Sequence, residues 1–475
     1  MRDQEILDIE LDGERHEITV ELLNKYNVPG PRYTSYPTAP EWSDDYRCAD
    51  HVADLAAANA RETGEAERPV SLYFHIPFCE RLCLYCGCNV VINKNKEVAP
   101  PYIERLTRET RMVASQVSRN RPVVQLHWGG GTPTYLSPAQ IEEVFGAISE
   151  QFTIAADAEV GVEIDPRVTT PEHVRALRKV GFNRVSMGVQ DFDPTVQQTV
   201  RRIQPFEATR DLVALCRESG FQSVNVDLIY GLPYQTAGSF ADTIAKVEAI
   251  APDRIAMYSY AHVPWLKKQQ KSFAAHLPQG MDKFRIFRAG VTGFSKAGYV
   301  YIGMDHFAKP SDELAVALRA RTLHRNFQGY STRAHADLLG MGVSAISGLR
   351  RSYAQNYRDL AAYYAAVDRD DLPVMRGFAL DEDDILRREV ITRILCHRLI
   401  SKGEIGRAFG IDFDSHFAGE LRRVEDLVAD GLVTLDGDVM RATPVGCIFL
   451  RNIAMVFDRY LQKQRIESPV FSRTL

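Results

Sequence analysis

The loop of residues 75–88, with the sequence HIPFCERLCLYCGC, brings three cysteines together as C-x3-C-x2-C. Thiolates from Cys79, Cys83 and Cys86 can bind three corners of a [4Fe–4S] cluster. Because a four-iron cube needs four ligands, one iron is left for a ligand that is not cysteine. An open iron of this kind is what S-adenosylmethionine needs to bind through its amino and carboxylate groups. The spacing therefore predicts an iron–sulfur site.

Two other interpretations of the cysteine spacing are a zinc knuckle and a group of buried free thiols. A structural zinc site usually has a second ligand pair spaced as C-x2-C or H-x3-H, and no such pair follows in the sequence. The other cysteines are scattered, as is typical of free thiols in a reducing cytoplasm. We expect a cytosolic protein, because an oxidising compartment would destroy an exposed three-thiolate loop.

The length of 475 residues allows one large domain and a smaller one. Hydrophobic residues make up 45% and charged residues 25%, which is ordinary for a soluble globular protein. The net charge of −5 argues against a surface that binds nucleic acid. The amino terminus lacks a signal or transit sequence, and no stretch approaches the ~20 uncharged apolar residues of a membrane span.

Short β-rich runs alternate with amphipathic helical patterns from about residue 70. The predicted strands are Val70–His75, Val123–Trp128, Glu159–Ile164, Arg184–Val189, Ser223–Ile229 and Arg254–Tyr260. Helices are predicted at Tyr102–Arg119, Pro138–Phe152, Pro171–Val180, Glu207–Ser219 and Ser239–Ala249. Six β/α units in series predict an α/β fold, with a parallel sheet curled by right-handed crossovers into a partial (β/α)6 barrel.

Three regions of different character divide the chain. Residues 1–52 are irregular, with PGPRYTSYPT at residues 29–38, and form either a frayed terminus or, as we favour, a lid over the barrel. Residues 53–370 are the expected catalytic domain, with the barrel core at about 70–265. Residues 371–475 are expected to form a mainly helical C-terminal domain.

The C-terminal region has the pattern of a winged-helix-type module. Leu386, Val390 and Ile394 share one helical face, and a later hairpin is predicted at the turn Asp436–Asp438. Such modules often bind nucleic acid, but residues 376–475 carry nearly equal numbers of basic and acidic side chains. A packing or lid domain is therefore the better interpretation.

Polar residues end five successive predicted strands, where the functional residues of a parallel barrel gather. The second strand ends in the turn GGGTP at 129–133, whose N–H groups could receive the amino-acid end of S-adenosylmethionine. Glu163 ends the third strand and could bond ribose hydroxyls. The next three strands end in Gln190-Asp191, Asp227 and Tyr260-Ala261-His262. Each residue alone could be a helix cap or an ion-pair partner, but together they predict one pocket.

Several longer motifs accompany the cysteine loop. They are PRYTSYPT at 31–38, YFHIPFC at 73–79 followed by Cys88 and Asn89, HWGGGTPT at 127–134, EIDP at 163–166, SMGVQDF at 186–192, DLIYGLP at 227–233, IGMDHFAKP at 302–310, HRNFQGY at 324–330 and GMGVSAI at 340–346. From about residue 25 to its end, the chain resembles the oxygen-independent coproporphyrinogen III dehydrogenases (oxidases), radical S-adenosylmethionine enzymes of haem biosynthesis. Cys88 and the segment YTSYP at 33–37 distinguish this family from related haem chaperones.

The resemblance implies a cluster held by Cys79, Cys83 and Cys86, with Cys88 near it but not bound to it. It also implies two S-adenosylmethionine molecules side by side. The cluster-bound molecule would contact Tyr73, Gly130, Glu163 and Ile346. The second would contact Tyr85, Gly131, Thr132, Gln190, Arg202, Asp227 and Ala261. Tyr85 stands where the family often has another aromatic residue, so its hydroxyl is an addition.

The implied reaction turns two propionates of coproporphyrinogen III into vinyl groups and gives protoporphyrinogen IX. A 5′-deoxyadenosyl radical takes a hydrogen from the β-carbon of each propionate, after which CO2 and one electron leave. The expected partners are this substrate and a one-electron donor protein, with no nucleic acid and no membrane, and the chain is expected to act as a monomer.

Four carboxylates on the substrate call for cationic contacts at the barrel mouth. The candidates are Arg32, His306, Lys309 and Arg325, which lie in Pro- and Gly-rich segments outside the regular alternation. Surface or ion-pair roles are the alternative for each of them. Two other functions stay open at this point: a radical enzyme that degrades or methylates haem itself, and a non-catalytic haem chaperone, against which YTSYP and Cys88 speak.

Overall fold

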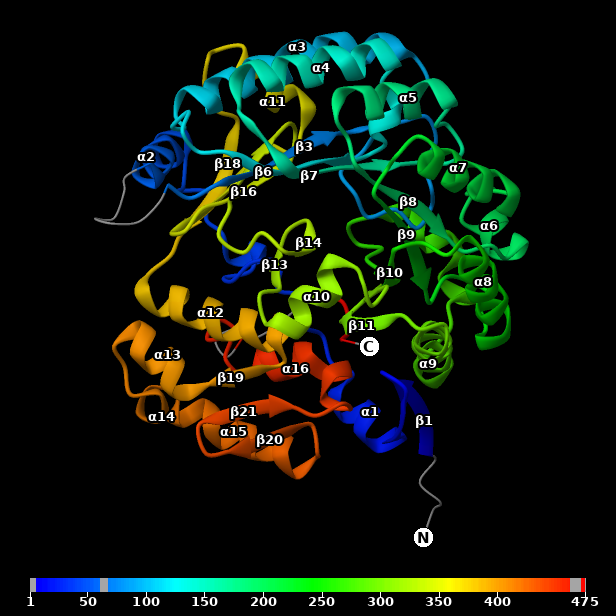
Figure 1. The fold of residues 1–475 in the computed structure, drawn as a ribbon, viewed down its shortest axis with the longest axis vertical. Helices are drawn as coiled ribbons and strands as arrows, with labels where there is room; N and C mark the ends of the chain where they lie inside the picture. The colour runs from blue at the N-terminus through cyan, green and yellow to red at the C-terminus, as the bar shows by residue number, and fades with distance from the viewer. Residues whose placement is uncertain (1–5, 60–66, 462–470, 475) are drawn as a thin grey trace.

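A twelve-stranded sheet forms the centre of the protein, seen in a computed structural model that describes residues 6–59, 67–461 and 471–474. The strand order is β11-β12-β10-β9-β8-β7-β6-β3-β15-β16-β17-β18. Helices cover the convex side of the curved sheet, and the C-terminal domain lies below its open side (Figure 1). No helix in the described part of the chain is long and apolar enough to cross a membrane.

Six neighbouring strands in the middle of the sheet are parallel, as the sequence predicts. They are β3 (Val70–Ile76), β6 (Val123–Gly130), β7 (Ile154–Ile164), β8 (Arg184–Gln190), β9 (Ser223–Tyr230) and β10 (Arg254–Ser259). β7 begins earlier than predicted because Ile154 pairs with Val123 of β6.

The sheet is an open partial barrel, because different strands continue it at its two edges. At one edge β15 (Asp337–Met341) runs parallel to β3. β16 (Ile346–Gly348), β17 (Ser352–Asn356) and β18 (Val374–Ala379) follow it in antiparallel pairs. At the other edge β12 (His306–Ala308) and β11 (Val300–Gly303) are antiparallel to β10 and to each other.

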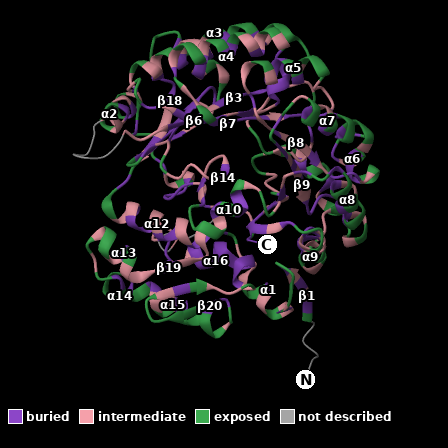
Figure 2. Cartoon of the chain, viewed as in Figure 1, coloured by how far each residue is buried: buried purple, intermediate pink, exposed green. Residues whose placement is uncertain are grey.

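Helices of the β/α units lie on the convex face: α3 (Ala99–Ser115), α4 (Pro138–Gln151), α5 (Pro171–Val180), α6 (Pro194–Thr199), α7 (Phe206–Glu218), α8 (Ala237–Ile250) and α9 (Gly280–Lys296). Their starts follow from local chemistry: Ser137 and Thr170 each accept a hydrogen bond from the N–H three residues on, and a proline follows each. Figure 2 shows the buried strands and the exposed outer faces of these helices.

The N-terminal segment holds more regular structure than the sequence predicted. β1 (Ile6–Leu11) and β2 (Glu14–Thr19) form a hairpin, followed by α1 (Val20–Tyr26) and, after an irregular stretch, α2 (Cys48–Ala58). The prediction of an irregular start was wrong there. The sequence does contain a hairpin pattern there. Apolar Leu7, Ile9 and Leu11 alternate with other residues and are the buried side chains of β1, and the turn pair Asp12-Gly13 has positive φ at both residues.

The C-terminal domain is mainly helical with a small sheet. Its elements are α12 (Glu382–His397), β19 (Leu399–Ser401), α13 (Lys402–Phe409), α14 (Phe413–His416), α15 (Ala418–Ala429), β20 (Val433–Asp436), β21 (Val439–Ala442) and α16 (Leu450–Met455). β20 and β21 form the predicted hairpin, and β19 pairs with β21.

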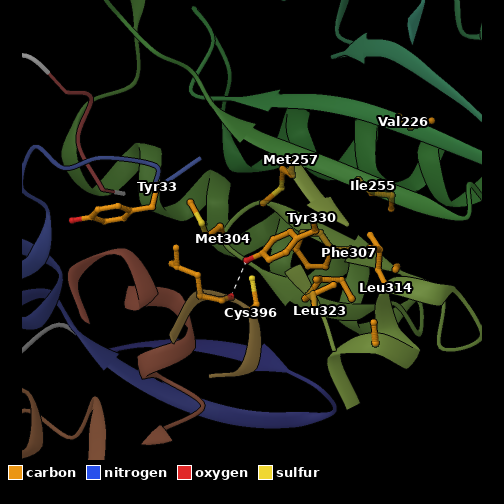
Figure 3. Close-up of a cluster of buried hydrophobic side chains, with 14 of the residues drawn as sticks. Tyr33, Val226, Ile255, Met257, Met304, Phe307, Leu314, Leu323, Tyr330 and Cys396 are labelled. Carbon is orange, nitrogen blue, oxygen red and sulfur yellow. Dashed lines mark hydrogen bonds between the residues drawn. The ribbon is translucent and has the colours of Figure 1, made fainter. Parts of the chain in front are cut away.

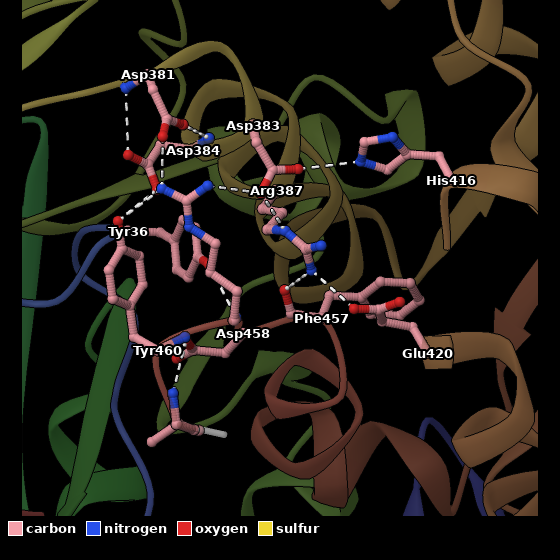
Figure 4. A network of polar contacts seen from close by, with 12 residues as sticks. Tyr36, Asp381, Asp383, Asp384, Arg387, His416, Glu420, Phe457, Asp458 and Tyr460 are labelled. Carbon is pink, nitrogen blue, oxygen red and sulfur yellow. Dashed lines mark hydrogen bonds and ion pairs between the residues drawn. The ribbon is translucent and has the colours of Figure 1, made fainter. Parts of the chain in front are cut away.

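An ion-pair network joins the start of α12 to the chain after α16 (Figure 4). Arg459 bridges Asp381 and Asp383, each at 2.7 Å, and Arg387 joins Asp383 to Glu420. The hydroxyl of Tyr36 accepts a hydrogen bond from the Arg459 N–H at 3.1 Å, so the network also reaches the N-terminal segment.

A short hairpin and a helix fill the concave side of the sheet. They are β13 (His324–Asn326) with β14 (Gly329–Ser331), and α10 (Glu313–Ala320). Tyr330 of β14 lies in an apolar cluster with Met257, Phe307 and Leu323, and its hydroxyl donates to the Leu395 carbonyl at 3.1 Å (Figure 3). The hairpin is thereby fixed between the barrel and α12.

Candidate functional site

The cysteine loop leaves the carboxyl end of β3 and is closed on itself by backbone contacts. β4 (Phe78–Cys79) pairs with β5 (Val91–Ile92), and the Cys86 N–H donates to the Cys83 carbonyl at 3.0 Å. All three predicted ligands are free cysteines; Cys83 is buried and the other two are partly exposed. The fold therefore places the three thiols on one compact loop at the mouth of the barrel.

Groups that stabilise thiolates surround this loop. Thr132 Oγ1 lies 3.3 Å from Cys79 Sγ. Cys83 Sγ lies 3.4 Å from Nη2 of Arg167 and 3.6 Å from Nη1 of Arg202. Among the described residues, no group of three His, Cys, Asp or Glu side chains is arranged to hold a single metal ion. The donor set of three thiols beside two guanidiniums fits the electron-rich thiolates of an iron–sulfur cluster.

Asp165 and Arg167 are parts of this site that the sequence did not single out. Asp165 accepts from Arg167 at 2.6 Å and from Arg202 at 3.2 Å. Burial opposes ionisation of Asp165, but the two guanidiniums outweigh it and lower the pKa of the carboxyl to about 2. The ionised Asp165 thus fixes both arginines beside Cys83. The sequence feature that could have indicated them is that both charged residues directly follow the third predicted strand.

The residues expected around the first S-adenosylmethionine converge at the ends of β3, β6 and β7. Glu163 accepts from the Gly130 N–H at 3.2 Å, and its other oxygen lies 3.5 Å from His127 Nε2. The rings of His127 and Tyr73 stack with centroids 6.2 Å apart. Gly130 has φ +112°, and a Cβ there would lie 2.6 Å from the His75 ring, so only glycine fits.

Ile346 reaches the same place from the added strands. Gly340 of β15 pairs with Tyr73 of β3, and a Cβ on Gly340 would lie 2.4 Å from the Ile346 carbonyl oxygen. Ile346 is therefore two strands away from Tyr73, with only the side-chain-free Gly340 of β15 between them. The structure thus brings together the four residues expected around the first molecule.

The second expected set includes Gln190 at the end of β8, Asp227 in the carboxyl half of β9 and Ala261 just after β10. Asp227 accepts from Ser186 Oγ at 3.0 Å and from Asn225 Nδ2 at 2.8 Å. Burial, followed by the charge of Glu163, raises the pKa of Asp227 to about 7. Gln190 has a positive φ of 68° beside a β-bulge, and Arg202 donates to the neighbouring Gly188 carbonyl at 2.5 Å.

Buried Gln270 ties two further members of this set together. Its Nε2 donates to the carbonyl of Tyr85 at 3.0 Å and to that of Ala261 at 3.2 Å. Gly131 and Thr132 donate their N–H groups to the carbonyls of Ile76 and Phe78 in the cysteine loop. Nothing in the sequence pattern singled out Gln270, because it lies in a 3-10 helix (Lys268–His276) outside the β/α alternation.

A cavity of about 150 Å³ opens inside the barrel beside these residues. Its lining includes Glu163, Asp227, Tyr258, His306 and Gln328. Both amide atoms of Gln328 and Nδ1 of His306 are buried without a hydrogen-bond partner among the described residues. Buried polar atoms of this kind mark a place for a polar ligand or water.

Three of the four cationic candidates lie near this cavity. Arg32 pairs with Asp305 at 2.7 Å and lies over the Tyr258 ring, and Arg325 lies over the Tyr330 ring. His306 lines the cavity itself, but burial and the nearby Arg325 lower its pKa to about 3, so it is a neutral hydrogen-bonding group.

Lys309 is the exception among the candidates. Its Nζ pairs with Asp253 at 2.9 Å, next to the amino end of β10 and therefore at the opposite end of the barrel from the cysteine loop. The expectation that Lys309 lies at the mouth was wrong.

Comparisons with known proteins agree with this geometry. The Radical SAM superfamily matches residues 73–247, and the HemN C-terminal domain matches residues 380–449. The chain is 45% identical over 464 residues to the oxygen-independent coproporphyrinogen III oxidase of Synechocystis, covering 97% of this chain and 98% of that protein. It is 46% identical to the Escherichia coli protein of the same name, covering 96% and 98%.

A solved structure is also similar along most of the chain. It is the coproporphyrinogen III oxidase HemN from Escherichia coli, described as a radical SAM enzyme. The TM-score is 0.86 at 45% identity, with 90% of this chain and 97% of that one covered.

Proposed function

Since the chain belongs to the oxygen-independent coproporphyrinogen III oxidases of the radical SAM superfamily, we propose that it decarboxylates two propionates of coproporphyrinogen III to vinyl groups, giving protoporphyrinogen IX. The observation that carries this proposal is the three-cysteine loop at the mouth of a partial barrel whose strand ends present Glu163 and Asp227 to one cavity. Membership of the superfamily brings a [4Fe–4S] cluster and S-adenosylmethionine as cofactors.

Cys79, Cys83 and Cys86 would hold the cluster, and the guanidiniums of Arg167 and Arg202 would balance its thiolate charge. When bound, the cluster and S-adenosylmethionine supply one electron and a carbon radical able to take hydrogen from an unactivated C–H bond, which no side-chain acid or base can do. The side chains of the barrel therefore bind, orient and exclude water.

We propose two S-adenosylmethionine sites in the barrel mouth. Tyr73, Gly130, Glu163 and Ile346 would form the first, with the Glu163 carboxylate accepting hydrogen bonds from ribose hydroxyls. The second would be formed by Tyr85, Gly131, Thr132, Gln190, Arg202, Asp227 and Ala261. After burial, the charge of Glu163 is the next cause that raises the pKa of Asp227. This proximity of the two carboxyls supports placing the two sites next to each other.

Residues 1–52 would act as the lid of the catalytic domain at 53–370, with residues 371–475 as a packing domain beneath it. Arg451 of α16 donates to the carbonyls of Gly30 and Pro31, and Tyr33 donates to Asp458 at 2.9 Å. These contacts support a lid that is fastened to the C-terminal domain and keeps water from the barrel mouth. Arg32, His306 and Arg325 would contact the substrate.

The remaining proposals concern the setting of the reaction. We place the protein in the cytoplasm as a monomer that receives electrons from a one-electron donor protein. The eight free cysteines support a reducing compartment.

The test is an anaerobic assay of the reconstituted protein with coproporphyrinogen III, measuring vinyl product and 5′-deoxyadenosine. We expect both products to form together. Turnover of haem instead of coproporphyrinogen, or binding of haem with no turnover of either compound, would overturn the proposed function in favour of a haem-modifying enzyme or a haem chaperone.

A further inference from the structure

A second cavity, of about 620 Å³, lies on the other side of the β13–β14 hairpin from the barrel cavity. Its walls include the N-terminal segment Tyr33–Tyr36, the hairpin, helix α12, and residues from the stretches 332–338 and 348–353. The volume is within the roughly 300–1,000 Å³ that binding sites for organic ligands occupy. Of the residues given a substrate or cofactor role above, Arg325 is the one that lines this cavity.

The lining of this cavity is strongly basic. Six arginines line it but only two carboxylates, those of Asp337 and Glu389. Asp337 is paired with Arg121 and with Arg68, and Glu389 is paired with Arg393 at 2.7 Å. Both carboxylates of the lining therefore form ion pairs with arginines. Because the lining has more arginines than carboxylates, it carries an excess of positive charge.

Arg325 is the side chain that points most directly to an anionic ligand. It is only 8% exposed, and its Nε and Nη1 are buried without a hydrogen-bond partner among the described residues. The guanidinium is held 4.8 Å from the centroid of the Tyr330 ring. Leaving buried guanidinium donors unfilled is costly, and carboxylates that enter the cavity would accept hydrogen bonds from them.

Arg388 of α12 offers a second guanidinium in the same cavity. Its contacts are with the Tyr353 hydroxyl at 3.3 Å and the Arg350 carbonyl at 2.5 Å, both uncharged groups. The rings of Phe327 and Tyr353, which also line the cavity, meet edge to face with centroids 6.1 Å apart. Two arginines beside aromatic rings match a ligand that carries carboxylates on an unsaturated ring system.

We propose that this cavity binds the tetrapyrrole substrate, with Arg325 and Arg388 holding propionate carboxylates that are not reacting. The inference rests on the proposed function and names the place of its substrate. One hairpin separates the two cavities: Arg325 and Phe327 face the basic cavity, while Gln328 and Tyr330 face the barrel cavity. A bound macrocycle is thus one hairpin away from Glu163 and Asp227.

The test is anaerobic titration of the cluster-loaded protein with coproporphyrin III, the oxidised tetracarboxylate that cannot be decarboxylated as substrate, followed by its fluorescence. We expect Arg325→Met and Arg388→Met each to weaken binding about 10- to 150-fold, the range for a lost charge-assisted hydrogen bond. Arg175→Met is the matched control, because Arg175 lies on the outer helix α5 and pairs with Glu172. Its affinity should equal that of the wild type.

The tetramethyl ester of the same porphyrin separates carboxylate recognition from apolar binding. We expect it to bind weakly and to be insensitive to either substitution. Equal affinity of wild type and both variants for the tetracarboxylate, tight binding of the ester by the wild type, or no saturable binding at all would overturn the assignment. Arg325→Lys and the more accessible Arg388→Met keep the test valid where Arg325→Met does not fold. Because binding is measured without turnover, a failed decarboxylation assay would remove the proposed reaction without touching this result.

Discussion

Arg32 donates two hydrogen bonds to a single oxygen of Asp305, at 2.7 and 3.1 Å, across 273 residues of sequence. Asp305 is buried at the turn before β12, so the pair joins the N-terminal segment to the edge of the barrel. The same segment is held from the other side by Arg451 of the C-terminal domain. Three parts of the chain therefore meet at this edge of the barrel.

This pairing makes a deletion of the whole segment a poor test of the lid. Leu7, Ile9, Leu11, Tyr33 and Tyr36 all belong to the main apolar core, so their removal would damage the fold itself. We predict that Arg32→Met lowers the free energy of unfolding by about 3 kcal/mol, because it leaves the Asp305 carboxylate buried and unpaired. Adding Asp305→Asn should recover part of that loss in urea unfolding.

The functional effect of Arg32→Met tests the lid separately from stability. We expect the variant to form 5′-deoxyadenosine without an equivalent amount of vinyl product, since the barrel mouth is less well sealed. A double variant that recovers stability but stays uncoupled would assign sealing to Arg32. Fully coupled turnover by the folded Arg32→Met protein would count against the lid.

The cysteine loop yields a sharp prediction about the cluster. Cys79→Ser, Cys83→Ser and Cys86→Ser should each lose the visible iron–sulfur absorbance after anaerobic reconstitution, because two thiolates do not hold the cube. Cys88→Ser should keep it and serves as the matched control from the same loop. Loss of absorbance in Cys88→Ser together with full retention in Cys86→Ser would reverse the ligand assignment.

Glu163→Ala should weaken the binding of S-adenosylmethionine and leave the cluster intact. The loss of charge-assisted hydrogen bonds is worth ~1.5–3 kcal/mol, or roughly 10- to 150-fold in affinity. Calorimetry of the reconstituted protein measures the affinity, and iron content checks the cluster. Glu172→Ala on the outer helix α5 is the control. An unchanged dissociation constant for Glu163→Ala would remove this residue from the cofactor site.

Much of the fold and of the cofactor site could be predicted from sequence, because the signals are local. Each of the six parallel strands has its own apolar run. Glu163 and Gln190 lie at strand ends and Asp227 lies in the carboxyl half of β9, on the side where the barrel rule expects functional residues. The cysteine loop needs only its own spacing to bring three thiols together.

What sequence reasoning missed depends on contacts between distant segments. Gln270 lies in a 3-10 helix and Gln328 in the turn of a short hairpin, and only folding brings them to the site. The predicted position of Lys309 was wrong because residues close in sequence can lie at different levels of the barrel. Lys309 is close to His306 in sequence, but β12 runs antiparallel to β10 and carries the chain from the level of Ala256 to that of Arg254 within three residues. Lys309 directly follows this strand, and its N–H donates to the Asp253 carbonyl just before the start of β10.

Asp227 links the cofactor site to the pH dependence of stability. Its folded-state pKa is raised from 3.8 to about 7 by burial and then by Glu163. A carboxyl whose pKa is higher in the folded than in the unfolded protein favours folding most when it is protonated. Its contribution is therefore complete below pH about 4 and is lost as the pH rises toward 7.

Asp227→Asn removes the charge and keeps the shape, so it should stabilise the protein only where the wild-type carboxyl is ionised. At pH 8 we expect the variant to melt higher, by about 1 °C for each kcal/mol of relieved charge burial in a chain of this length, and the gain to vanish near pH 4. The variant should also bind less S-adenosylmethionine per chain, because an amide replaces the carboxylate at the second site. The control is Asp282→Asn on the exposed start of α9, which should melt like the wild type across this range. A gain for Asp227→Asn that is the same at pH 4 and pH 8 would show that it arises from packing, and the ionisation of Asp227 would then have no part in it.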